Sequence, residues 1–80
     1  MDYTFPIFKQ DILQGREVEF KYENSLYSIT NTPNGFCFCK FYEDDVCFDS
    51  PNELLEKVQI DGKNLEEIFS EHKFQLVRLY

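Results

Sequence analysis

Three cysteines have the residue type and spacing closest to a chemical site in this chain. Cys37 and Cys39 alternate with aromatic residues in GFCFCKF, and Cys47 follows. Residues i and i+2 share one face of a strand, so both thiols can approach one metal ion. A structural zinc site needs four ligands, usually from C-x-x-C pairs in turns, and here the fourth would have to be an acid. Because free cysteine is commonly buried, ordinary packing is favoured, with a thiol or metal site as the alternative.

An odd number of cysteines argues against a disulfide framework, and a reducing cytoplasm fits such a composition best. The first residues, MDYTFPIFKQ, lack the basic region and apolar run of a signal peptide. No apolar stretch approaches the roughly 20 residues that a membrane helix needs. We therefore expect a cytoplasmic protein.

Acidic residues dominate the charge: fifteen Asp and Glu against eight Lys and Arg give −7. Without a basic patch, neither direct nucleic-acid binding nor binding to an anionic membrane is expected. Glu43, Asp44 and Asp45 form an acidic tip that lacks the spacing and glycine of a calcium loop. Rows of carboxylates can imitate a phosphate backbone, so an anti-defence inhibitor of a nucleic-acid-binding enzyme is one alternative. The simpler interpretation is that these acids keep the chain soluble.

The sequence offers no catalytic constellation. His72 is the single histidine, and no Ser-x-x-Lys, Gly-x-Ser-x-Gly or phosphate-binding glycine loop accompanies it. A general base needs a nucleophile or partner placed against it. An 80-residue chain also has little volume for a substrate pocket. We expect a protein that is not an enzyme and needs no cofactor.

Aromatic residues are too numerous for one small core, and tyrosine is enriched at protein interfaces. Aromatic side chains near the acidic tip and in the C-terminal tail are therefore interface candidates. A homodimer through an edge strand or the tail is a further expectation. The candidate partner-binding residues are Tyr42, Glu43, Asp44, Asp45, Phe74 and Tyr80.

The first half of the chain must position these residues. Residues 4–14 have helical spacing and end at Gly15, which predicts a short helix. Residues 17–23 alternate as a strand with Val18, Phe20 and Tyr22 on one side.

Two tight turns follow that strand. A two-residue turn at Asn24-Ser25 would place Tyr22 opposite Tyr27 and Phe20 opposite Ile29, keeping the apolar residues on one face. A second turn is predicted at Asn34-Gly35, which puts Phe36, Phe38 and Tyr42 beside Ile29 and Tyr27. A register slipped by one residue is the alternative there, and either register makes the third strand central.

The second half changes period. Ser50-Pro51-Asn52-Glu53 is a helix start with a capping serine, and that helix is predicted to end near Val58. A connector follows, with Ile60 directed into the core, and then a helix from Asn64 to Glu71. Residues 74–80 form either a fifth strand or an extended arm. The fold class is thus α+β, a single domain over 1–80: a four-stranded antiparallel meander, extended by that fifth strand if it forms, packed on two or three short helices.

Two segments, FKYENSLYSI and SPNELLEKVQIDGKNLEEIF, carry a resemblance. Their order resembles that of short uncharacterised proteins of low-GC Gram-positive bacteria and their phages. The resemblance spans about two thirds of the chain and implies no activity, and the cysteine-rich strand departs from the group's pattern. The shared positions are Phe20, Tyr22, Tyr27, Ile29, Leu54, Leu55, Ile60, Asp61, Gly62, Lys63 and Leu65.

These observations predict a small acidic interaction module, bacterial or phage-borne, that acts by binding a protein partner. Its negative charge favours a basic partner.

Overall fold

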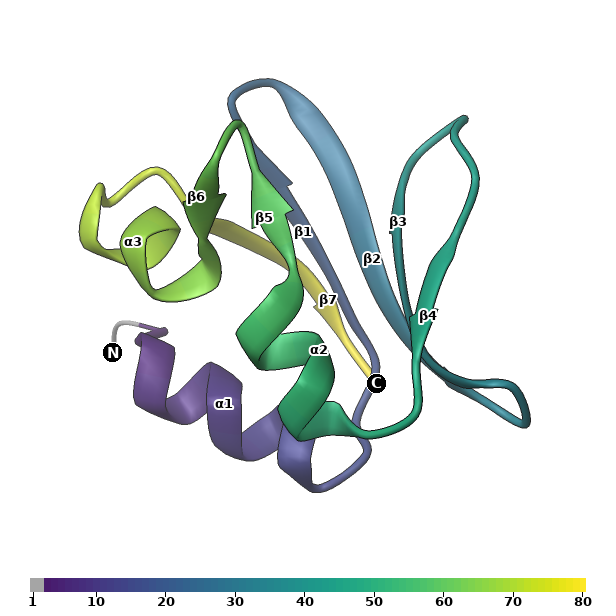
Figure 1. The fold of residues 1–80 in the computed structure, drawn as a ribbon. Coiled ribbons are helices and arrows are strands. Elements are labelled where there is room, and N and C mark those ends of the chain that lie inside the picture. The colour runs from purple at the N-terminus through teal and green to yellow at the C-terminus, as the bar shows by residue number, and fades with distance from the viewer. Residues whose placement is uncertain (1–2) are drawn as a thin grey trace.

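The computed structural model describes residues 3–80, and it has the predicted α+β fold. One sheet has the strand order β4-β3-β2-β1-β7 and is antiparallel throughout, and β5 and β6 form a separate ribbon. Figure 1 shows the sheet with α1, α2 and α3 packed in front of it. The elements are α1 (Phe5–Leu13), β1 (Val18–Tyr22), β2 (Ser25–Thr32), β3 (Gly35–Lys40), β4 (Val46–Phe48), α2 (Pro51–Lys57), β5 (Gln59–Ile60), β6 (Lys63–Asn64), α3 (Leu65–Ser70) and β7 (Gln75–Leu79).

The first hairpin has the predicted face but not the predicted register. Its turn residues are Glu23 and Asn24, with φ of 51° and 65°. Phe20 therefore lies opposite Tyr27, not Ile29. The turn forms one residue earlier because two successive positive φ angles match the twist of the flanking strands, and Asn tolerates that conformation. The register moves by two residues, so the apolar residues stay on one face.

The second hairpin turns at Pro33-Asn34 and not at Asn34-Gly35. Proline suits the second position of a type I turn and glycine the fourth, and this preference outweighs the Asn-Gly pair. The Thr32 hydroxyl accepts a hydrogen bond from the Asn34 amide at 3.1 Å. Phe38 lies opposite Ile29, so the predicted face of β3 is confirmed. The prediction that Tyr42 joins this face is wrong, because β3 ends at Lys40.

The C-terminal segment is a strand and not an arm. β7 pairs with β1 in antiparallel fashion, with a shift of register between Glu19 and Phe20. The Tyr80 amide donates to the Glu17 carbonyl at 2.9 Å, and Arg16 Nε donates to the Tyr80 carbonyl at 3.1 Å. β1 thereby becomes an inner strand, and β7 and β4 are the two edges of the sheet.

Both predicted helix starts are confirmed. The Ser50 hydroxyl accepts from the Glu53 amide at 3.1 Å, and Pro51 occupies the first turn of α2. Asn64 and Glu67 form a reciprocal capping box at the start of α3. Between these helices, β5 and β6 form a short ribbon that periodicity did not predict, since each strand has two residues.

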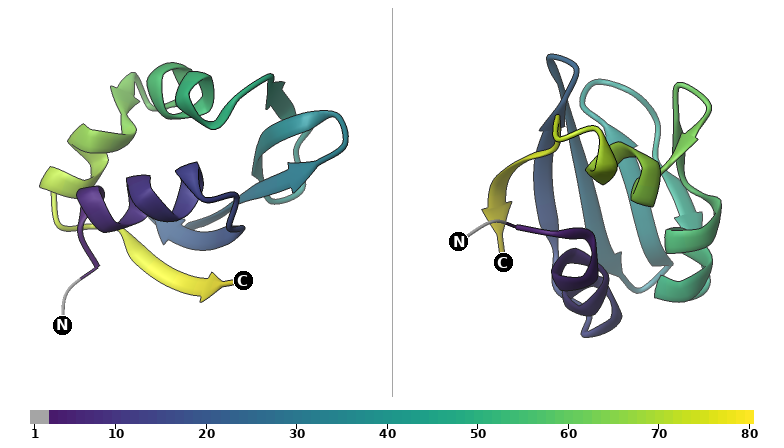
Figure 2. Two further views of the ribbon diagram at one scale, coloured as in Figure 1. Left: turned by 90° about the horizontal axis from the view of Figure 1, so that it is seen from below. Right: turned by 90° about the vertical axis from the view of Figure 1, so that its left-hand side faces the viewer.

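The hydrophobic core lies between one face of the sheet and the helices. Figure 2 shows the helices on that face of the sheet. The core joins the inward residues of β1 and β2 to those of the helices and the β5–β6 ribbon. No helix within residues 3–80 is both long and apolar enough to cross a bilayer. The buried members of this core are Phe8, Ile12, Val18, Phe20, Tyr22, Tyr27, Ile29, Leu54, Val58, Ile60, Leu65 and Ile68.

Gly35, at the end of the second turn, lies close to the backbone of β4. A Cβ added there would lie 2.2 Å from the Phe48 carbonyl oxygen, at a φ of +117°. We predict that Gly35→Ala lowers the free energy of unfolding by more than about 2 kcal/mol, because backbone strain and a clash combine. Gly62→Ala is the matched control: Gly62 has a φ of +78° and no atom within 4 Å of an added Cβ.

Urea denaturation of both variants measures this difference. Gly62→Ala should lose only about 1–2 kcal/mol from backbone strain. Equal losses in the two variants would contradict the close packing of Gly35 against β4.

Candidate functional site

The β3–β4 hairpin carries four of the six residues predicted to bind a partner. Tyr42, Glu43, Asp44 and Asp45 form its loop, and all four are exposed. Tyr42 is fully exposed, with a positive φ of 72°. Among these acids, Glu43 forms an ion pair with Lys40, at 3.6 Å. The loop therefore presents carboxylates and one aromatic ring to solvent.

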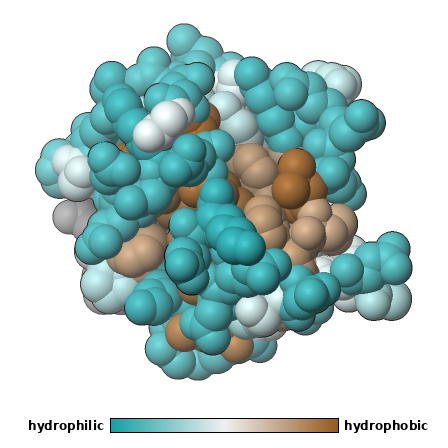
Figure 3. Space-filling model, in the orientation of Figure 1, coloured by the Kyte–Doolittle hydropathy of each residue, from teal (hydrophilic) through white to brown (hydrophobic). Residues whose placement is uncertain are grey.

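An apolar patch lies beside this loop, over β3 and β4 (Figure 3). Val46 is paired with Phe38, and Phe48 with Phe36, so these four side chains share one face of the two strands. Val46 is 55% exposed, and the three phenylalanines are half-buried. We call Phe36, Phe38, Val46 and Phe48 the hairpin patch. Sequence reasoning missed Val46, whose run is too short to show a period.

The opposite side of the same hairpin holds the three cysteines. Cys37 and Cys47 pair across β3 and β4 and form a disulfide, although the odd cysteine count argued against a disulfide framework. The tertiary pairing brings these two together, a fact that counting cysteines cannot reveal. Cys39 is a free thiol on the same face as Cys37, and burial together with the adjacent Asp45 carboxylate raises its pKa. Cys37 is buried, as the packing interpretation expected.

The two predicted aromatic residues of the tail lie elsewhere and apart from the loop. Phe74 is half-buried and stacks on Phe69 and Phe20, with ring centroids 4.0 and 4.5 Å apart. It is therefore largely a packing residue, contrary to the expectation of a free aromatic side chain. Tyr80 is 57% exposed at the end of β7, and its hydroxyl donates to Glu19.

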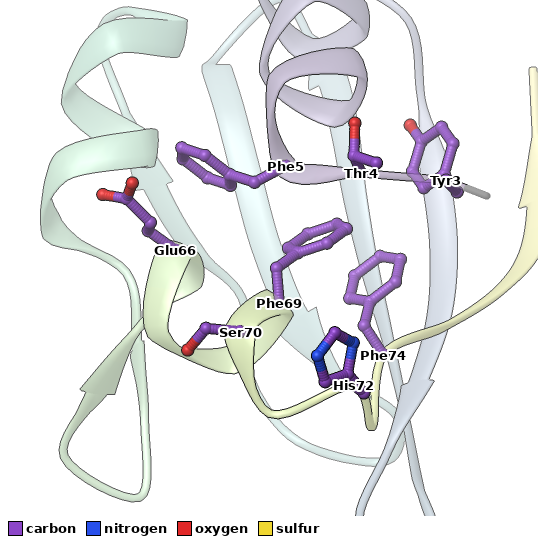
Figure 4. A pocket seen from close by; sticks show the side chains of 8 residues that line it. All are labelled: Tyr3, Thr4, Phe5, Glu66, Phe69, Ser70, His72 and Phe74. Atoms are coloured by element: carbon purple, nitrogen blue, oxygen red, sulfur yellow. The ribbon is translucent and has the colours of Figure 1, made fainter.

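A hollow of about 600 Å³ opens between the start of α1 and α3. Figure 4 shows aromatic rings forming its floor, with Glu66, Ser70 and His72 at its edge. The Tyr3 hydroxyl donates to the buried Asp11 at 2.7 Å, and burial first, then Asp11, raises the Tyr3 pKa. The lining residues are Tyr3, Thr4, Phe5, Glu66, Phe69, Ser70, His72 and Phe74.

His72 does not gain a catalytic partner in this hollow. Its φ of 59° follows from the tight turn between α3 and β7. Ser70, the hydroxyl nearest in sequence, donates at 2.7 Å to the Glu67 carbonyl of its own helix. The arrangement is a stacked aromatic cluster with a polar edge, and it lacks the nucleophile–base hydrogen bond that covalent catalysis requires.

Glu71, at the end of α3, links this helix to β1 and to β6. Tyr22 donates its hydroxyl to Glu71 at 2.6 Å, and the Lys63 ammonium forms an ion pair with the same carboxylate. The hydrogen bond from Lys63, followed by that from Tyr22, lowers the pKa of Glu71. The same contacts raise the pKa values of Lys63 and Tyr22.

Comparison of the chain with family models, with curated proteins and with solved structures finds no match.

We predict that Glu71→Gln lowers the melting temperature at pH 7 by several degrees. A carboxylate whose pKa is lowered by folding stabilises the fold above its unfolded pKa, about 4.3. That stabilisation is lost as the pH falls through the lower folded pKa, so the difference between wild type and variant should shrink below about pH 4.

Thermal unfolding monitored by circular dichroism between pH 7 and pH 2 measures this effect. Glu66→Gln removes the same charge from an exposed position of α3 and serves as control. A Glu71→Gln deficit that stays constant over this range would contradict the assigned contacts.

Proposed function

We propose that this chain is a non-enzymatic module that binds a protein partner through the hairpin patch and the adjoining acidic loop. The observation that carries the proposal is the exposure of apolar side chains beside an exposed acidic loop. Val46 is 55% exposed although its neighbours belong to the core side of the sheet. Apolar patches rimmed by polar residues are typical of interaction sites.

The composition of this surface favours a basic partner. Glu43, Asp44 and Asp45 border the hairpin patch in a chain of net charge −7. Complementary charge accelerates association and selects the partner, while the apolar centre supplies most of the affinity. A second copy of this chain would meet the same negative charges, so self-association through this surface is disfavoured.

We place this interaction in the cytoplasm of a low-GC bacterium or of a cell infected by its phage. The abundance of Phe, Tyr, Ile, Asn and Lys, whose codons are rich in A and T, supports the low-GC source. In such a compartment the Cys37–Cys47 pair would be mostly reduced.

We predict that Val46→Ser weakens partner binding by about tenfold, because loss of an interface anchor removes about 1 kcal/mol or more of binding free energy. Val77→Ser is the matched control, since Val77 is 47% exposed on the distant edge strand β7. Immobilised wild type and both variants would be incubated with a low-GC Gram-positive lysate. Bound proteins would be quantified by mass spectrometry, and the affinity of the enriched protein then measured directly.

Retention of the same partner by Val77→Ser and its loss from Val46→Ser would support the hairpin patch. Equal binding by both variants would reject it. Sedimentation of the purified chain separates a partner interaction from self-association through either sheet edge.

Phosphate mimicry by the acidic loop is a second candidate. It is favoured by the exposure of all three carboxylates at one end of the hairpin. We predict for this candidate that the double variant Glu43→Gln, Asp44→Asn loses most partner binding. Wild type should also lose most binding at 0.5 M salt, because the Debye length there is about 4 Å and exposed charges farther apart than this no longer attract each other. Glu56→Gln with Glu66→Gln removes equal charge from exposed positions of the helices.

Binding that survives high salt and the loop variant would exclude mimicry and leave the apolar patch as the source of affinity. Loss in both double variants would indicate general attraction between an acidic and a basic protein, with no role specific to the loop.

A further inference from the structure

The cysteine face of the β3–β4 hairpin gathers more ligand atoms than a disulfide requires. Cys37 and Cys47 lie opposite each other, with Cα atoms 4.0 Å apart. Asp45 immediately precedes β4, and its carboxylate oxygen and the two sulfurs all lie within 4.8 Å of one another. Cys37 is buried, whereas Asp45 and Cys47 are exposed, so the cluster is reachable from solvent on one side.

Cys39 extends this cluster along β3. It lies on the same strand face as Cys37, and its sulfur contacts the carbonyl oxygens of Lys40 and Glu43 at 3.1 and 3.2 Å. Burial and, after it, the nearby Asp45 carboxylate raise the pKa of the Cys39 thiol. Asp45 thus stands beside all three sulfurs, in the place of the acid that a fourth ligand would require.

We propose that reduction of the Cys37–Cys47 disulfide converts this face into a zinc site. Cys37, Cys47 and Asp45 would supply three ligands, and Cys39 would supply the fourth. Three thiolates and one carboxylate are the ligand types that zinc prefers, in the number that a tetrahedral site needs.

The geometry requires only local movement. Ligand atoms bound about 2.0–2.3 Å from a tetrahedral zinc lie about 3.5–3.8 Å from one another. The sulfurs of Cys37 and Cys47 separate to that distance once their bond is broken. The Asp45 oxygen, which lies within 4.8 Å of both sulfurs, approaches by at most about 1.3 Å. The Cys39 sulfur lies outside this group of three atoms, so its thiol must turn from the two carbonyl oxygens toward the metal. These shifts involve side chains of β3, of the loop and of the edge strand β4.

The reductant is a cellular thiol, and the exposed sulfur is its point of attack. A thiolate RS⁻ attacks Cys47 Sγ, forming an R–S–S–Cys47 bond and releasing Cys37 as a thiolate. A second thiolate attacks the R sulfur, which releases Cys47 as a thiolate and leaves RSSR. Two thiols are oxidised and one disulfide is reduced. The protons that the reductant thiols lost remain in solution, since zinc binds the thiolates.

This proposal does not depend on the proposed partner surface. The cysteines lie on the sheet face opposite the hairpin patch, because residues 37, 39 and 47 alternate with residues 36, 38, 46 and 48. Either proposal can fail while the other holds.

The test titrates Zn²⁺ into the purified 80-residue chain, in its oxidised form and after reduction by a phosphine that is then removed without air. A chromophoric chelator competes for the metal. We expect one Zn²⁺ per reduced chain and none per oxidised chain. Co²⁺ used as a probe should give a thiolate charge-transfer band, which Cys39→Ser lowers by about one third, because it removes one of three thiolates.

Matched loop variants test the carboxylate. Asp45→Asn should weaken zinc binding by about tenfold or more, a loss typical of changes in a metal's ligand environment. Asp44→Asn removes the same charge from the neighbouring exposed residue and should change the affinity less than twofold. Circular dichroism confirms that both variants fold.

Three results would overturn the proposal: no zinc bound by the reduced chain, equal binding by oxidised and reduced chains, or equal affinities of Asp45→Asn and Asp44→Asn. Cys47→Ser gives a final check: it also removes one of the three thiolates, so it should weaken zinc binding and lower the Co²⁺ band by about one third, as Cys39→Ser does.

Discussion

Burial of one face of the β1–β2 hairpin beneath the helices is the constraint on which the rest of the structure depends. Val18, Phe20 and Ile29 are fully buried on that face, and Tyr22 nearly so. Because strand side chains alternate, this burial directs the intervening polar residues to the opposite side of the sheet. It also fixes which side of β3 faces α2, since β3 pairs with β2. The hairpin patch therefore lies on the core side of the sheet, where its three phenylalanines pack against the core, and the cysteines lie on the opposite side.

The helices pack differently against the two ends of the sheet. Around β1 and β7, stacked aromatic rings and the Tyr22–Glu71–Lys63 contacts hold α3 against the sheet. Around β3 and β4 the helices give less cover, and a three-residue edge strand leaves Val46 exposed. Less cover at this end leaves apolar side chains accessible to another molecule. The acidic loop and the cysteines both lie at that end.

The fold decides which acidic residues are paired and which are exposed. A net charge of −7 predicts a preference for basic partners, but charge alone does not say where such a partner would bind. Glu71 accepts a hydrogen bond from Tyr22 and pairs with Lys63. Asp11 accepts a hydrogen bond from Tyr3. The loop acids are exposed beside apolar side chains, and Glu43 among them is paired with Lys40.

The sequence by itself determined the α+β class, the strand faces and both helix starts, since each follows from local pattern: alternation along the strands, a capping serine before Pro51, and Asn64 before the last helix. The structure decided the registers, because each hairpin could form either of two overlapping turns, and Glu23-Asn24 and Pro33-Asn34 are the turns that formed. It paired Cys37 with Cys47, placed Asp45 beside them and buried one side of Phe74. These contacts are made between residues that are distant in sequence or that meet only because two strands pair. Neither periodicity nor composition shows which residues become neighbours across a sheet.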